Sequence, residues 1–214
     1  MISHGLVNSF GVGVLKYLNV SSIVFHSLGV FSLGVALLAK APTHQSAHFV
    51  FATFYDGTAV GTDVGWSVRA SPEYVAVCGI LLSCYTITGY DASAHLSEET
   101  QNASWNAAMG VLMSIGVSAI FGFFLIISYL FSIQNFERTI NSQIGQPVTQ
   151  ILVDVFGVNG AIVLMTLIMV CVWHCGLFSM TSNSRMMFAF SRDRALPGFF
   201  DHVDKRFQSP IRTS

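Results

Sequence analysis

One polar stretch, from Thr86 to Glu99, interrupts an otherwise apolar segment with residues that can bind a charged solute or carry a proton. Its acid, Asp91, stands two residues after Gly89 and four residues before His95. A carboxylate at membrane depth is costly, so it normally faces a cavity or the interior of a helix bundle. Gly89 gives the backbone the freedom to leave the helix. The spacing therefore predicts a break in a membrane-spanning helix, with Asp91 at the break.

A break of this kind suits a zwitterion. An unwound membrane helix offers its freed amides to an anionic group and its freed carbonyls to a cation. Thr86, Thr88 and Tyr90 add hydroxyls beside Asp91, whose carboxyl group can pair with an ammonium group or carry a proton. The alternative is a glycine kink in which Asp91 caps the next helical segment. Spacing alone does not choose between a ligand site and a capped kink.

His95, Glu98 and Glu99 follow Asp91 at about one-turn spacing, so a resumed helix would place these groups along one side. Carboxylates and imidazole at this spacing also bind metals, which makes a membrane enzyme with a metal site one alternative. A metal site in a helix bundle draws carboxylates and histidines from several helices, and the sequence shows no second cluster. We therefore predict no metal, no cofactor and no enzyme.

The composition predicts a membrane protein. Of the 214 residues, 52% are hydrophobic and 10% are charged, whereas a soluble domain carries about 25% charged residues. The formal net charge is -1, which argues against the concentrated basic face that nucleic-acid binding requires. The lipid bilayer is therefore an expected partner, and nucleic acid is not.

Four apolar stretches are long enough to cross a bilayer as helices, which takes about 20 residues each. They are residues 20–39, 73–97 with a break near 88–91, 107–133 and 159–182. Polar loops are predicted between the first and second and between the third and fourth stretches. An aromatic run at 48–55 is too short to cross and is expected at the membrane interface. The predicted fold class is an all-α, polytopic helical membrane protein with a tail over 183–214.

The basic residues predict the orientation. If the four stretches alternate, seven of the ten Lys and Arg residues fall on the side of Lys16 and the tail, and three fall on the side of the two long loops. Cytoplasmic segments carry the excess of Lys and Arg. The tail is therefore predicted to be cytoplasmic, in a multi-pass protein of the plasma membrane or an organelle membrane.

Two motifs carry a resemblance to a known family. The run TGYDASAHLSEETQNASWNAAMG, starting at Thr88, resembles the sixth helix and following loop of the amino acid–polyamine–organocation superfamily. The run NSRMMFAFSRDRALPGFF, starting at Asn183, resembles its cytoplasmic stretch after the eighth helix. The words HLSEET and APTHQSA are most similar to the branch that transports choline, GABA and related amino acids. The resemblance covers essentially the whole chain, from the end of the fourth helix to the eighth.

This resemblance implies part of a LeuT-type fold, in which two inverted repeats bind substrate between the unwound parts of the first and sixth helices. It implies transport of amino acids or small amines by alternating access, and it leaves open whether a proton or sodium drives transport. Thr88, Gly89 and Tyr90 match the unwound segment, and Asp91 matches its acid. Tyr85 stands where relatives often place a gating aromatic residue.

Other matched positions are assigned to coupling or gating. Glu98 and Glu99 match the inner acidic pair, and with Asp91 and His95 they are the coupling candidates. Arg185, Arg192 and Asp193 match the cytoplasmic motif, for which a structural or gating role is implied. The sequence departs from the family where prolines commonly follow the acidic pair, as at Ala108, which leaves the start of the third span open.

The sequence contains no glycine-rich first helix, so the resemblance is to a fragment of a permease. We expect this chain alone to show no uptake in reconstituted vesicles. A non-transporting membrane protein with an interaction or regulatory role is the other alternative, and its mark would be co-purification with an intact permease without substrate binding.

Overall fold

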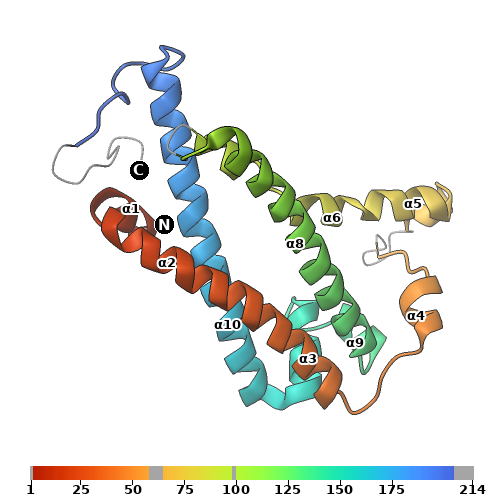
Figure 1. Cartoon of the computed structure of the whole chain (residues 1–214). Coiled ribbons are helices and arrows are strands. Elements are labelled where there is room, and N and C mark those ends of the chain that lie inside the picture. The colour runs from red at the N-terminus through yellow and green to blue at the C-terminus, as the bar shows by residue number, and fades with distance from the viewer. Residues whose placement is uncertain (1, 58–64, 98–99, 205–214) are drawn as a thin grey trace.

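The structure of the protein is a computed structural model that describes residues 2–57, 65–97 and 100–204. Within these ranges, the regular elements are helices (Figure 1). Three helical segments are long and apolar enough to cross a membrane, namely Gly13–Lys40, Ala103–Phe131 and Pro147–Arg192. The all-α, polytopic membrane architecture expected from the sequence is thereby confirmed.

The first crossing segment begins earlier than the sequence predicts. It consists of α2 (Val12–Val24), a π-helical turn η1 (Phe25–Gly29) and α3 (Val30–Lys40), and α1 (Ile2–Phe10) precedes it. The predicted span starts at residue 20 because the apolar residues before it are interrupted by His4, Asn8, Gly11, Gly13 and Lys16. The structure keeps Lys16 exposed on the helix surface, so its charge does not end the helix.

The last crossing segment is longer than predicted at both ends. After α8 (Ala103–Phe131) and α9 (Phe136–Ile140), α10 runs over Pro147–Arg192 and is kinked at Gly157, where φ is 73° and ψ is 175°. Essentially only glycine adopts this conformation without strain. The first arm of α10 occupies the predicted loop before residue 159, because its apolar residues Ile151 and Leu152 are buried.

Helix α10 also continues into the predicted tail. Ser184 and Ser191 are buried rather than exposed, and the Ser184 hydroxyl donates to the Thr181 carbonyl at 3.0 Å. Hydroxyl groups that bond the preceding turn are compatible with a helix. The polar sequence after residue 182 therefore does not end the helix.

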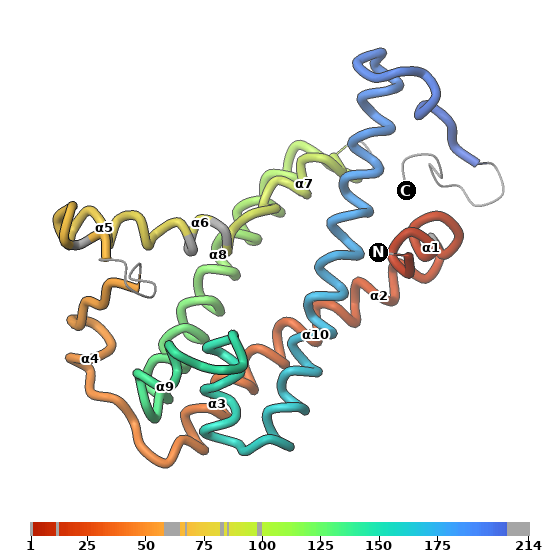
Figure 2. Tube along the Cα trace, turned by 180° about the vertical axis from the view of Figure 1, so that it is seen from behind, coloured from red at the N-terminus to blue at the C-terminus, as the bar shows by residue number. Residues whose placement is uncertain are grey.

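The second predicted span is divided into short helices. These are α5 (Pro72–Gly79), α6 (Leu81–Thr86) and α7 (Ala92–His95), and the loop before them contains α4 (Ala47–Ala52) and a 3-10 turn η2 (Trp66–Val68). In Figure 2 the trace from α5 to α7 approaches α8 from the side and then follows it. No one of these short helices has the length to cross a bilayer by itself.

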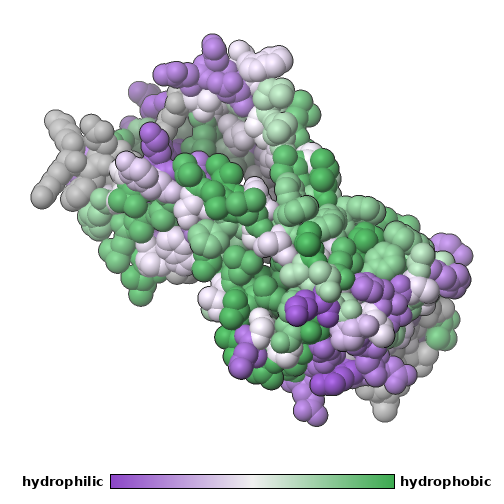
Figure 3. All heavy atoms as spheres, turned by 60° about the horizontal axis from the view of Figure 1, so that its bottom comes forward, coloured by the Kyte–Doolittle hydropathy of each residue, from purple (hydrophilic) through white to green (hydrophobic). Residues whose placement is uncertain are grey.

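The apolar core lies where α3, α8 and both arms of α10 meet. Leu37 and Leu152 are fully buried in it, together with Leu33, Ile133 and Ile151. Elsewhere the long helices carry exposed apolar side chains, and Figure 3 shows wide hydrophobic surfaces along them. In water such surfaces would associate, so they suit a bilayer or further helices.

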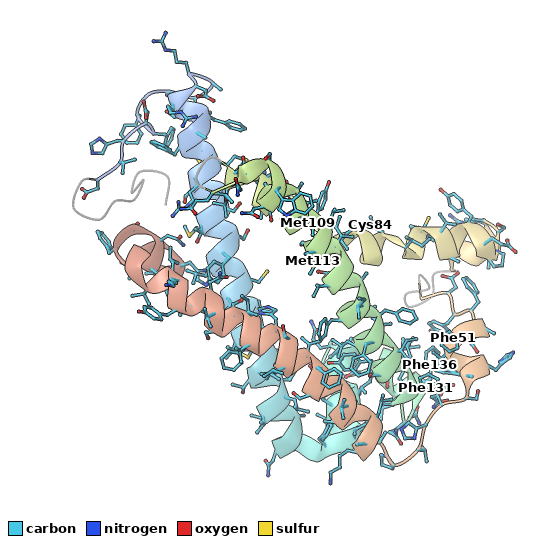
Figure 4. All side chains as sticks on the ribbon, in the orientation of Figure 1. Phe51, Cys84, Met109, Met113, Phe131 and Phe136 are labelled. Carbon is cyan, nitrogen blue, oxygen red and sulfur yellow. The ribbon has the colours of Figure 1, made fainter. Side chains whose placement is uncertain are left out.

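Aromatic contacts hold α4 against the ends of α8 and α9. The rings of Phe51 and Phe131 lie 6.2 Å apart, and those of Tyr55 and Phe136 lie 5.0 Å apart at right angles. Figure 4 shows Phe51, Phe131 and Phe136 gathered on this side of the molecule. The predicted aromatic run is thus helical only up to Ala52, and its rings pack on the ends of α8 and α9. Its position at the membrane interface stays a prediction.

Gly34 allows α3 and α8 to pack closely. It is buried, and a Cβ atom there would collide with the ring of Phe124 in α8. We expect Gly34→Val to lower the free energy of unfolding by about 1–3 kcal/mol, because overpacking pushes the two helices apart. Thermal unfolding in detergent measures this loss. Gly116→Val is the control, since nothing stands within 4 Å of a Cβ atom at Gly116, and equal losses would contradict the packing role.

A buried amide joins α1 to α10. Asn8 is 4% exposed; its side-chain amide donates to the Leu177 carbonyl at 3.3 Å and its oxygen accepts from the Thr181 hydroxyl at 2.6 Å. We expect Asn8→Ala to cost about 1 kcal/mol of stability, because hydrogen bonds between membrane helices are individually modest. Proteolysis between α1 and α2 reports the loosening. The exposed Asn19 provides the control Asn19→Ala, and equal proteolysis of the two variants would show that the bridge does not hold α1 in place.

Candidate functional site

The predicted helix break is present at Gly89. Helix α6 ends at Thr86, residues 87–91 form turns, and α7 resumes at Ala92. Gly89 has a φ of 90°, in the left-handed region that favours glycine. The Ala92 amide then donates to the Gly89 carbonyl at 3.1 Å, which starts the next helical turn. Gly89 therefore lies in the turn that separates α6 from α7 and allows the chain to change direction between them.

The carboxylate of Asp91 and the imidazole of His95 form a pair. Asp91 Oδ2 and His95 Nε2 are 2.9 Å apart, from residues one helical turn apart, and the two side chains are 52% and 33% exposed. Asp91 stands at the first position before α7, but its side chain makes no capping hydrogen bond to the helix. Of the capped-kink alternative, the glycine kink is present, but the Asp91 side chain does not cap α7. The geometry leaves the carboxylate accessible to a second cationic or hydrogen-bonding group.

The hydroxyl residues at the break are exposed, and Thr86 lies beside α8. Thr86, Thr88 and Tyr90 are all exposed. The Thr86 methyl would lie 3.9 Å from a Cβ atom at Gly122 of α8, and the Ser93 hydroxyl would lie 2.6 Å from one at Gly110. The small residues of α8 therefore let the broken segment run close along it. The break has one wall from α8 and an open side.

Three candidate residues lie wholly or partly outside the described part of the chain. Glu98 and Glu99 fall in the gap between residues 97 and 100, and for Tyr85 only its place in α6 is described. The metal-site alternative needs Glu98 and Glu99 beside Asp91 and His95. In the ranges that the structure covers, no three His, Cys, Asp or Glu side chains gather closely enough to hold a metal ion.

One cavity lies away from the break. Its volume is about 380 Å³, and its walls come from the first crossing segment, α8 and α10. A second cavity, of about 460 Å³, lies between the loop around Tyr55 and α5. None of the predicted substrate-binding residues lines either cavity.

A histidine contact between α2 and α10 was not expected from the sequence. His174 is buried; its Nδ1 lies 2.9 Å from the Val170 carbonyl, and its Nε2 lies 3.3 Å from the Ser21 hydroxyl. The carbonyl can only accept, so Nδ1 carries the proton and Ser21 donates to Nε2. The sequence signal was a histidine and a serine in two apolar helices, which is too weak to pair them. The role of this contact is helix packing.

Comparison with known proteins relates this chain to amino acid permeases. The amino acid permease family matches residues 1–214. The amino-acid permease BAT1 homolog of Oryza sativa subsp. japonica is 35% identical over 206 residues, which are 92% of this chain and 38% of that protein. The amino-acid permease BAT1 of Arabidopsis thaliana is 35% identical over 202 residues, 91% of this chain and 38% of that protein.

A more distant relative is the GABA-specific permease of Saccharomyces cerevisiae, 32% identical over 138 residues, which are 63% of this chain and 24% of that protein. No solved structure matches. The chain spans 38% of the length of the two plant relatives. What those whole proteins do therefore extends to this chain only as a proposal.

Proposed function

This chain belongs to the amino acid permease family, and we propose that it provides the broken-helix side of a substrate site in amino acid transport. Family membership places it among multi-pass membrane transporters rather than enzymes. The proposed substrates are amino acids or related small amines, of the kind named for the GABA-specific relative. The proposed mechanism is alternating access, with substrate held at the break in residues 73–97.

The observation that carries this proposal is the left-handed Gly89 two residues before an accessible acid. Freed backbone groups at the break suit a substrate carboxylate, and Asp91 suits a substrate ammonium group. Thr86, Thr88 and Tyr90 supply hydroxyls for orientation, and Tyr85 is proposed to gate. The open side of the break is the side on which other helices of a permease would complete the site.

The Asp91–His95 pair is proposed to couple transport to an ion. Both groups can take up a proton, and their separation of 2.9 Å allows a proton to be shared. Glu98 and Glu99 are proposed to act with them at the inner mouth, with the tail on the cytoplasmic side. Uptake that depends on a pH gradient and survives replacement of sodium would support a proton, whereas strict dependence on sodium would oppose it.

The test uses a chimera in which this chain replaces the matching segment of the Arabidopsis thaliana relative. Vesicles containing the chimera should accumulate labelled amino acid or GABA, and unlabelled substrate should compete. A chimera that is folded and inserted but binds no amino acid or amine would overturn the proposal. This chain by itself in vesicles is the control, and we expect it to show no uptake.

A further inference from the structure

The cavity among the three crossing helices has the character of a hydrocarbon site. Its walls are almost entirely apolar, formed by side chains such as Leu33, Leu125 and Leu167, with His26 and Tyr129 as the polar-bearing exceptions. A water molecule needs two to four polar partners, which these walls do not supply, and apolar cavities accept apolar ligands. An amino acid would leave its charges unpaired here. The chemistry of the walls therefore selects a hydrocarbon.

The π-helical turn shapes one wall of this cavity. His26 and Gly29 belong to η1, and both line the cavity. The imidazole Nδ1 of His26 lies 2.8 Å from the Ser22 carbonyl one turn back, so this nitrogen is already bonded within its own helix. π-Helical turns inside α-helices are rare and occur frequently at functional sites. One wall of the cavity is therefore formed by a π-helical turn instead of regular α-helix.

The size of the cavity fits a chain rather than a helix. Its volume is about 380 Å³, whereas one turn of an α-helix about 10 Å wide and 5.4 Å tall fills about 400 Å³ by itself. Another membrane helix could cover the opening and place side chains in it, but its backbone could not enter the cavity. A single extended hydrocarbon chain is thinner than a helix and can enter.

The depth of the cavity matches one leaflet. His26 lies near the middle of the Gly13–Lys40 segment, and Leu33 lies nearer its Lys40 end. The seven-residue step between them rises about 10 Å, within the half-thickness of about 15 Å that one leaflet's tails fill. Val172, which is 65% exposed, and the exposed Cys175 form part of the rim, so the cavity opens sideways. A lipid tail in a surrounding bilayer can enter such a side opening and needs no route through water.

We propose that this cavity, between η1, α8 and α10, binds the acyl chain of a membrane lipid. The bound chain takes the place of packed side chains between the three helices and supports their separation. The site is separate from the helix break at Gly89, and it takes a different class of ligand from the proposed transport substrate. Binding can therefore be tested without any transport measurement.

The experiment uses the full chain in lipid nanodiscs containing a phosphatidylcholine with a photoreactive group within one acyl chain. Val172→Trp places a bulky ring at the cavity rim. The control is Met169→Trp, because Met169 is also 65% exposed on α10 but does not line the cavity. Peptides carrying the photolabel are identified by mass spectrometry, and circular dichroism reports whether each variant is folded.

We expect the label to concentrate on peptides containing His26–Leu33 and Leu167–Cys175, and Val172→Trp to reduce it there by about tenfold, since most of the buried hydrocarbon contact is lost. Met169→Trp should leave it unchanged. Labelling spread evenly over the helices, or equal in both variants, would overturn the proposal. A parallel sample with a photoreactive sterol separates the two hydrocarbon sources, and capture of sterol without acyl chain would also overturn it.

Discussion

Replacing Gly89 with alanine is expected to reduce uptake by the chimera by about fivefold or more, because the break depends on a conformation that alanine resists. Gly89 has a φ of 90° and nothing stands within 4 Å of a Cβ atom there. The effect of the substitution is therefore backbone strain alone, which costs about 1–3 kcal/mol in this region. That energy corresponds to about fivefold to 150-fold in the population of the broken form.

Gly79→Ala is the matched control for this change. Gly79 ends α5 seven residues before Thr86, nothing stands within 4 Å of a Cβ atom there, and its φ is not positive. Alanine in a helix is more favourable than glycine by about 1 kcal/mol, so the control should transport normally. Uptake is measured together with thermal unfolding of both variants. If Gly89→Ala transports as well as Gly79→Ala does, the strained break has no part in transport.

The break could be predicted because all of its determinants are local. Glycine loosens the helix and a nearby acid requires a polar partner, so the two together in an apolar stretch indicate a break. The one-turn spacing of Asp91 and His95 is likewise enough to bring their side chains together on a helix. In the structure Gly89 is left-handed at the break, and Asp91 Oδ2 and His95 Nε2 lie 2.9 Å apart. The role of these residues in binding substrate stays a prediction.

Segment ends were less predictable because polarity does not always end a helix. The second arm of α10 follows Gly157, close to the predicted start of the fourth span at residue 159. The helix continues ten residues past the predicted span end at residue 182, to Arg192, with Ser184 and Ser191 buried on it. A hydropathy scale counts these serines as polar residues that favour a loop. In the helix, the Ser184 hydroxyl donates to the Thr181 carbonyl of the preceding turn, so it needs no contact with water.

Contacts between distant segments had no signal in the sequence. The hydrogen bonds of Asn8 with α10 and the approach of Thr86 to Gly122 depend on how helices pack in three dimensions. The π-helical turn at Phe25–Gly29 likewise has no local composition that marks it. The π-helical turn lines the cavity and Gly122 lies beside Thr86 near the break, so these positions could be obtained only from the structure.

Replacing Asp91 with asparagine is expected to lower substrate affinity in the chimera by about tenfold to a hundredfold. Hydrogen bonds to charged groups contribute about 1.5–3 kcal/mol, and each 1.4 kcal/mol is about a factor of ten in affinity. Asparagine keeps the size of the side chain and removes the charge that we propose pairs with the substrate ammonium group. Competition binding with labelled GABA measures the change, and Asp91→Glu should restore part of the affinity.

The pair with His95 requires a second comparison, because Asp91→Asn also weakens that contact. If Asp91 acts only by holding His95, then His95→Gln should cause the same loss, and the double variant should be no worse than either single variant. If Asp91 contacts substrate, His95→Gln should leave affinity nearly intact and alter only the pH dependence of uptake. Glu137→Gln, an exposed acid on α9, controls for the loss of one charge. Because the Asp91 side chain is 52% exposed and its contact with His95 uses only Oδ2, the carboxylate has room for a second partner, and direct substrate contact is the outcome we expect.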